Sequence, residues 1–155
     1  MSEEFDALKR SRARAYLESV RDLRYTLDAL QDEIEMERKA MQPRGMRFDR
    51  LGGCSSAYAI PDGVARLEAM AARYVDAERA YIEAADGAHA AIAAAKSPKG
   101  ASILLRRYLL GKQWCEVAAD VGCSKSTAQR LHDEALLDVY DAMPFEWRIP
   151  RQPAI

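Results

Sequence analysis

The first half of the chain carries apolar side chains at alternating intervals of three and four residues. The first stripe of this kind begins at Ala13 and ends at Met41, and only Glu37 interrupts it. Its positions are occupied by Ala13, Tyr16, Val20, Leu23, Leu27, Leu30, Ile34, Glu37 and Met41. This spacing is typical of the packing face of a coiled-coil helix, so the sequence predicts one long helix over this range.

A second stripe with the same spacing follows, and alanine fills its later half. Its positions are occupied by Leu67, Met70, Tyr74, Ala77, Tyr81, Ala84, Ala88, Ala91 and Ala95. Because a lone helix of this kind buries too little apolar surface to be stable, each predicted helix needs the other, or a second subunit, as its partner. We therefore expect a long antiparallel coiled-coil-like helical hairpin that self-associates, most simply as a dimer.

The segment 42–63 separates the two stripes and is rich in turn-forming residues. Pro43 is expected to end the first helix, and the Pro-Asp-Gly sequence at 61–63 is expected to form a turn before the second helix begins. The Gly-Gly pair at 52–53 does not indicate a phosphate loop, since the Lys-Ser/Thr pair of that motif is missing. A loop of this length is uncommon in compact domains, and we expect it to form the tip of the hairpin.

The sequence KSPKG at 96–100 combines proline and glycine and marks the start of a C-terminal module. After it, the pattern predicts a short helix that Gly111 stops, and then a second helix over 114–121. Gly122 supplies the left-handed backbone conformation that a sharp turn between helices requires. Ser124 is a good N-cap for a third helix.

Small and apolar side chains in this module recur where two crossing helices need them. The expected inward positions are Val117, Ala118, Val121, Ala128, Leu131, Ala135 and Leu136. This order, with the glycine between the two short helices, matches the requirements of a helix-turn-helix, whose second helix enters the major groove of DNA.

The same register turns a set of polar side chains outward from the third helix. Gln129 suits adenine and Arg130 suits guanine edges, while serine and lysine suit phosphates or bases. The basic side chains of the preceding helix and loop add candidate phosphate contacts, although Arg106 and Arg107 are equally able to pair with Glu116 or Asp120. The candidate DNA-binding residues are Ser124, Lys125, Ser126, Gln129, Arg130, Arg106, Arg107 and Lys112.

The charge of the C-terminal module supports this location for a DNA-binding surface, whereas the net charge of the whole chain does not. The whole chain has 23 basic and 24 acidic residues and a net charge of −1. Between Lys99 and Arg130, however, the basic residues outnumber the two acidic ones, Glu116 and Asp120. A local positive excess in this module is what a nucleic-acid surface needs.

Several classes of protein are not expected. The acidic N-terminus is no signal peptide, and no apolar run is long enough to span a membrane, so we expect a cytoplasmic protein. The three cysteines, at 54, 115 and 123, are scattered and are expected to be reduced thiols. His89 and His132 each stand alone, so we expect no metal site and no cofactor. No nucleophile–base pair stands out, so we expect no enzyme.

The stretch LLRRYLLGKQWCEVAADVGCSKSTAQRLHDEALLDVY, residues 104–140, resembles the C-terminal module of RinA-like and ArpU-like phage transcriptional regulators, which is similar to region four of bacterial sigma factors. The matching residues are Arg107, Tyr108, Gly111, Trp114, Val117, Ala118, Val121, Gly122, Ser124, Thr127, Arg130, Leu131, His132, Ala135 and Leu136. Cys123 departs from the pattern, since an aromatic residue is common there. The resemblance implies a phage or prophage protein that controls late gene expression in the bacterial host cytoplasm.

The resulting expectation is an all-α protein with three parts: a helical hairpin over 1–96, a sigma-like helix-turn-helix over 97–143 and a tail over 144–155. It would bind double-stranded DNA sequence-specifically as a regulator, with RNA polymerase as a candidate second partner. One alternative is a small terminase-like DNA-packaging subunit, although the helix-turn-helix usually comes first there. The other is a protein-interaction adaptor, for example for RNA polymerase, in which the helix-turn-helix only packs.

Overall fold

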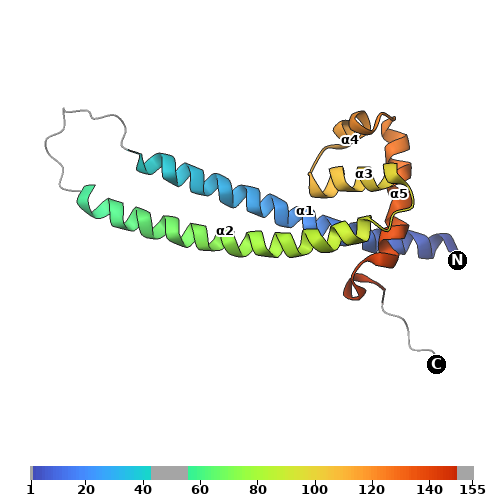
Figure 1. The fold of residues 1–155 in the computed structure, drawn as a ribbon, viewed down its shortest axis with the longest axis horizontal. Coiled ribbons are helices and arrows are strands. Elements are labelled where there is room, and N and C mark those ends of the chain that lie inside the picture. The colour runs from blue at the N-terminus through green and yellow to red at the C-terminus, as the bar shows by residue number, and fades with distance from the viewer. Residues whose placement is uncertain (1, 43–55, 150–155) are drawn as a thin grey trace, which may run out of the picture. The chain divides into compact units, whose positions relative to one another are not determined.

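The computed structural model describes residues 2–42 and 56–149, with backbone only at 56–61, and every regular element in these residues is helical. The α-helices are α1 (Ser2–Met41), α2 (Ser56–Ile92), α3 (Pro98–Leu104), α4 (Trp114–Val121) and α5 (Lys125–Ala142) (Figure 1). A π-helical turn, η1 (Leu105–Leu109), continues α3, and a 3-10 turn, η2 (Phe145–Trp147), follows α5. The all-α prediction is confirmed for these residues.

Contacts divide the chain into two compact units, and each is considered by itself. One unit lies within Met1–Arg24 and Tyr81–Ile155, and the other is Tyr25–Ala80. Both units contain a piece of α1 and a piece of α2. The predicted boundary at 96 lies between the end of α2 at Ile92 and the start of α3 at Pro98, but the apolar core of the first unit runs across it. The proposed division into three domains stays a prediction.

In the unit Tyr25–Ala80, the predicted stripe on α1 is the least exposed face of the helix. Between Tyr25 and Met41 the described side chains that are not exposed are those of Leu27, Leu30, Ile34, Glu37 and Met41. Each is a stripe position, so this part of the pattern is confirmed, whereas coiled-coil supercoiling stays a prediction.

Ion pairing explains the one charged residue in this stripe. Glu37 keeps only 21% of its side chain exposed and pairs with Arg66 of α2 at 3.5 Å. Four residues further along α1, the side chain of Met41 lies against Gly63, three residues before Arg66. The two helices therefore run antiparallel in this unit.

The expectation of a Pro-Asp-Gly turn at 61–63 is wrong, because α2 already begins at Ser56. Gly63 does not have a positive φ angle, so it does not act as a turn residue. A Cβ atom built there would come within 3.1 Å of the Met41 sulfur, so the glycine is needed for the close approach of two helices. Residues 43–55 of the predicted loop, with Pro43, the Gly-Gly pair and Cys54, lie outside the described residues.

In the first unit, the early part of α1 and the alanine-rich end of α2 pack into one core. Ala13, Leu17 and Val20 of α1 are at most 1% exposed, as are Ala88 and Ala91 of α2. The same cluster continues through η1 and α5. The small side chains thus permit close packing, as the alanine stripe predicts.

Part of the expected tail, 144–155, packs back onto the core. Trp147 packs against the core and lies 5.7 Å from the Tyr16 ring, between ring centroids. Arg148 donates to the carbonyl oxygens of Met143 and Asp141, at 3.0 and 2.7 Å. Phe145, in contrast, is 73% exposed. The last residues, 150–155, lie outside the described chain.

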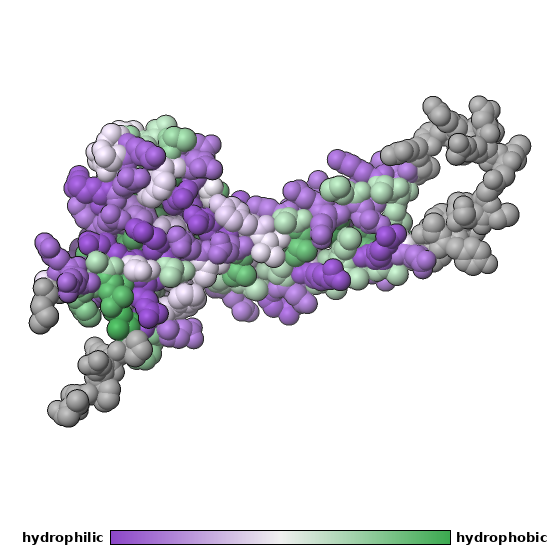
Figure 2. Space-filling view, turned by 180° about the vertical axis from the view of Figure 1, so that it is seen from behind, coloured by the Kyte–Doolittle hydropathy of each residue, from purple (hydrophilic) through white to green (hydrophobic). Residues whose placement is uncertain are grey.

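The surface view in Figure 2 shows hydrophilic colouring over most of one face, with hydrophobic patches interspersed. In the described part of the chain, no helix joins enough length to enough apolar character to cross a bilayer.

A charge placed in the α1 stripe should disrupt packing in the Tyr25–Ala80 unit. Leu30→Asp is expected to lower the free energy of unfolding by roughly 2 kcal/mol, because it replaces half-buried apolar surface with a carboxylate. Met36→Asp is the matched control: Met36 is 71% exposed, so the same chemical change should cost under about 0.5 kcal/mol. Circular dichroism during urea unfolding measures both, and equal effects would refute the stripe assignment.

Candidate functional site

A left-handed glycine turns the chain sharply between α4 and α5. Gly122 has φ 75° and ψ 39°, as the sequence predicts. Its N–H and that of Cys123 both donate to the Ala118 carbonyl oxygen, at 2.9 and 3.0 Å. The Cys123 bond, which reaches back five residues, caps the last turn of α4 in the way typical of a left-handed C-terminal glycine.

Ser124 starts α5 in the predicted way. Its hydroxyl oxygen accepts a hydrogen bond from the Thr127 N–H at 3.2 Å and lies 2.8 Å from the Thr127 hydroxyl. Of the candidate DNA-binding residues, Ser124 is thus engaged in capping, and its hydroxyl serves the helix first.

A small apolar cluster lies beneath the turn and fixes the register of both helices. Ile103, Val117, Ala118 and Ala128 form its buried centre, with Trp114, Val121, Cys123 and Leu131 around them. The inward positions predicted for this cluster are confirmed. Cys123 is half-buried at its edge, so a small thiol suffices where an aromatic residue is common in the resembling family.

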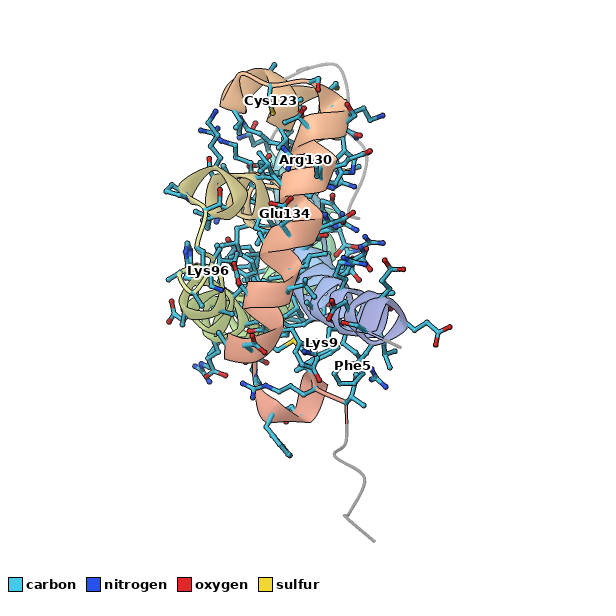
Figure 3. All side chains as sticks on the ribbon, turned by 90° about the vertical axis from the view of Figure 1, so that its right-hand side faces the viewer. Phe5, Lys9, Lys96, Cys123, Arg130 and Glu134 are labelled. Atoms are coloured by element: carbon cyan, nitrogen blue, oxygen red, sulfur yellow. The ribbon has the colours of Figure 1, made fainter. Side chains whose placement is uncertain are left out.

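The opposite face of α5 carries four of the candidate residues together. Lys125, Ser126, Gln129 and Arg130 are all exposed along the first turns of this helix. Arg130 forms an ion pair at 2.9 Å with Glu134, one turn further along α5 (Figure 3). Sequence reasoning missed this pair, although its i,i+4 spacing is a signal for it.

The side chains of the remaining basic candidates form contacts within the protein. Asp120 accepts from Lys112 at 2.6 Å and from Arg106 at 3.1 Å. The hydrogen bond from Lys112 is the main reason that the pKa of the Asp120 carboxyl is lowered. Of the two options left open by the sequence, Arg106 takes the pairing with Asp120.

Arg107 takes neither carboxylate partner. Its guanidinium donates to the Lys112 carbonyl oxygen at 3.0 Å and lies 5.3 Å from the centre of the Trp114 ring. Glu116 instead accepts from the Gln113 N–H at 3.0 Å, which caps the start of α4. These side chains brace η1 against α4.

A buried polar chain that the sequence pattern does not predict crosses from η1 to α5. The Tyr108 hydroxyl lies 2.7 Å from His132 Nε2, and His132 Nδ1 lies 3.1 Å from Asp133. The carboxylate fixes the proton on Nδ1, so Tyr108 donates to Nε2. Burial raises the pKa of Tyr108 to about 12 and lowers the pKa of His132 below its ordinary value. Both groups are therefore uncharged at neutral pH.

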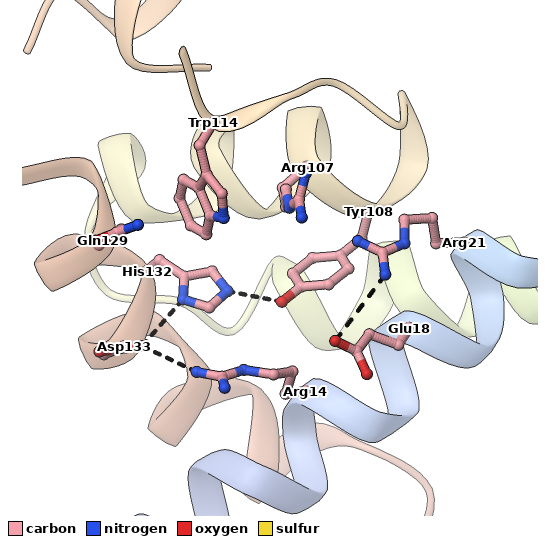
Figure 4. A pocket seen from close by; sticks show the side chains of 9 residues that line it. All are labelled: Arg14, Glu18, Arg21, Arg107, Tyr108, Trp114, Gln129, His132 and Asp133. Atoms are coloured by element: carbon pink, nitrogen blue, oxygen red, sulfur yellow. Dashed lines mark hydrogen bonds and ion pairs between the residues drawn. The ribbon is translucent and has the colours of Figure 1, made fainter. Parts of the chain in front are cut away.

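A cavity of about 340 Å³ opens beside this chain (Figure 4). The early part of α1 lines it with Arg14, and η1 lines it with Arg107. The Trp114 ring lies edge-on to His132 at 4.9 Å between centroids, and Gln129 of the exposed α5 face reaches the same cavity. The lining residues come from separate segments of the chain, so the pattern of no single segment predicts this cavity.

The cavity is lined by arginines, carboxylates, an amide, a histidine and aromatic rings. In the part of the chain that the structure describes, no cluster of His, Cys, Asp and Glu could hold a metal ion. Comparison with protein-family models, curated proteins and solved structures finds no match to the chain.

The left-handed turn can be tested without touching any side-chain contact. An added Cβ at Gly122 would meet nothing within 4 Å, so the cost of a substitution is backbone strain alone. Gly122→Val is expected to cost about 1–3 kcal/mol of unfolding free energy, whereas Gly122→Asn, which tolerates positive φ, should cost far less. Thermal melts of the two variants compare these costs, and similar melting temperatures would argue against a strained turn.

Burial of His132 should make stability depend on pH. Its folded-state pKa lies below the ordinary value of 6.5, so the unfolded chain binds the proton more tightly. The free energy of unfolding is expected to have its full value above about pH 6.5. It should decrease as the pH falls from there towards the folded-state pKa of His132. His132→Gln should flatten this fall in urea midpoints measured between pH 7.5 and 5.5. His89→Gln, at an exposed histidine, should retain it, and a flat wild-type profile would contradict the assignment.

Proposed function

We propose that this chain is a DNA-binding transcriptional regulator of phage or prophage late genes, with α4, Gly122 and α5 as its helix-turn-helix. The proposal assigns no catalytic role. Its recognition element is the first half of α5, and its ligand is double-stranded DNA.

One observation carries the proposal: a tightly fixed helix start presents adaptable polar side chains on one exposed face. The small cluster below holds Ala128 inward, and this leaves Gln129 and Arg130 exposed beside each other. Gln pairs in bidentate fashion with adenine and Arg with guanine in the major groove. Such contacts need a rigid support, which the capped and packed start of α5 supplies.

Phosphate contacts in this proposal come first from Lys125. It is exposed at the first residue of α5, where the helix dipole adds to its attraction for anions. Arg106 and Lys112 would have to share or leave Asp120 to reach a phosphate, so we assign them smaller contributions. Arg130 would likewise break its ion pair with Glu134 in order to contact a base. An exposed ion pair of this kind costs little to break.

Self-association is part of the proposal, since dimeric helix-turn-helix proteins bind paired half-sites. The unit Tyr25–Ala80 supports it by exposing large apolar side chains. Tyr25 is 49% exposed, Met36 71%, Val64 43% and Val75 49%. RNA polymerase remains a candidate second partner of the same chain.

Two substitutions should separate base reading from phosphate binding. On a duplex selected from a random library, Arg130→Ala is expected to cost about 1–3 kcal/mol and to relax preference at one base pair. Lys125→Ala should weaken selected and scrambled duplexes alike and reduce the slope of log affinity against log salt by about one. Fluorescence anisotropy at several salt concentrations measures both effects, with Lys39→Ala, an exposed lysine of α1, as the control.

Failure has a defined meaning in this experiment. If the wild type prefers no sequence, or both α5 variants bind like the control, the helix-turn-helix only packs and the adaptor alternative replaces the regulator. Sedimentation of the complex adds its stoichiometry: a dimer fits a regulator, whereas a large ring would favour the terminase-like alternative.

A further inference from the structure

The cavity between α1, η1 and α5 carries an excess of positive charge that the predicted recognition face does not include. Arg14, Arg21 and Arg107 line it, against the carboxylates of Glu18 and Asp133. Since His132 is neutral at pH 7, three guanidinium groups face two carboxylates, which leaves an excess of one positive charge. This balance suits a monoanion better than a dianion or a neutral ligand.

Arg14 is the lining cation most available to a ligand. Its contact with Asp133 is long, at 3.5 Å, and both side chains are about half exposed, at 49% and 47%. Exposed ion pairs with this geometry contribute little to stability. A phosphate oxygen pair can replace one carboxylate at a guanidinium with better, bidentate geometry.

The backbone of η1 is a second observation that points to this cavity. Leu110 N–H donates to the Leu105 carbonyl oxygen at 3.0 Å, which is the i to i+5 bond of a π turn. Turns of this type inside helices often occur at functional sites. Here the turn supplies both Arg107 and Tyr108 to the cavity wall (Figure 4).

We propose that this cavity binds a phosphodiester group of the DNA backbone, held by Arg14 and Arg107 beside the recognition face of α5. The inference rests on the proposed function and extends it, because it gives α1 a direct part in DNA binding. Gln129 connects the two surfaces, since it lines the cavity and is exposed on the recognition face. The phosphates that flank the major groove are the nearest monoanions to a helix lying in it. A free phosphate ester offers the same chemistry from another source.

The first arm of the test uses dimethyl phosphate, a monoanionic phosphodiester, and the intact protein without DNA. The two tryptophans make NMR of the indole N–H groups selective. Dimethyl phosphate is expected to shift the Trp114 resonance with saturation in the millimolar range. Trp147 does not line this cavity and is the internal reference, at constant ionic strength. Arg14→Gln should reduce the Trp114 shift.

The second arm measures duplex binding against salt concentration for Arg14→Gln and for Arg12→Gln. Arg12 is an exposed arginine on the same helix, two residues away and so on roughly the opposite side of it. Loss of one phosphate contact reduces the salt slope by about 0.9. A fourfold rise in salt should then weaken Arg14→Gln about 3.5-fold less than it weakens wild type or Arg12→Gln.

The outcomes separate the two sources and the two proposals. A reduced slope for Arg14→Gln alone supports the backbone phosphate, with or without a Trp114 shift. A Trp114 shift with an unchanged slope overturns the DNA source and leaves a free phosphate ester as the ligand. If neither changes, the cavity binds no phosphate. If wild type binds no duplex, the proposed regulator fails, and the dimethyl phosphate titration alone decides on the cavity.

Discussion

Burial of the early part of α1 beneath the C-terminal helices is the constraint on which the rest of the unit Met1–Arg24 and Tyr81–Ile155 depends. Leu17 of α1 and Leu136 of α5 are both fully buried in one cluster, which also contains Tyr108 of η1. Because these contacts join the start of the chain to its end, α5 is positioned by α1 as well as by α4. The polar chain from Tyr108 to Asp133 lies at the edge of this contact and fixes the facing side chains by hydrogen bonds.

Features that depend on neighbours in sequence were predictable. The α1 stripe, the Ser124 cap and the left-handed Gly122 each follow from spacing or from the conformational range of one residue. The inward face of α4 and α5 follows from helical periodicity in the same way. The Pro-Asp-Gly segment at 61–63 failed because the need for a small residue came from Met41 of another helix, which local turn statistics do not contain.

Features that depend on tertiary contacts were not predictable. Arg106 and Lys112 meet at Asp120 only because η1 lies against α4, and the sequence left the partner of Arg106 open. The cavity beside His132 needs side chains from α1, η1, α4 and α5 at once. Charge counting therefore overestimated how many cations of this module are available to a ligand.

The π turn at η1 constrains the length of the segment in which it lies. A π turn holds one residue more than an α turn, and one residue corresponds to about 100° of helical rotation. Ile103, just before the turn, belongs to the small cluster beneath Gly122, while Leu104 beside it and Tyr108 and Leu109 within the turn belong to the large core. One short segment thereby contributes side chains to two separate apolar clusters. Deleting a single residue there would rotate Tyr108 and Leu109 by about 100° relative to Ile103 and Leu104, so the length of this segment is as constrained as its composition.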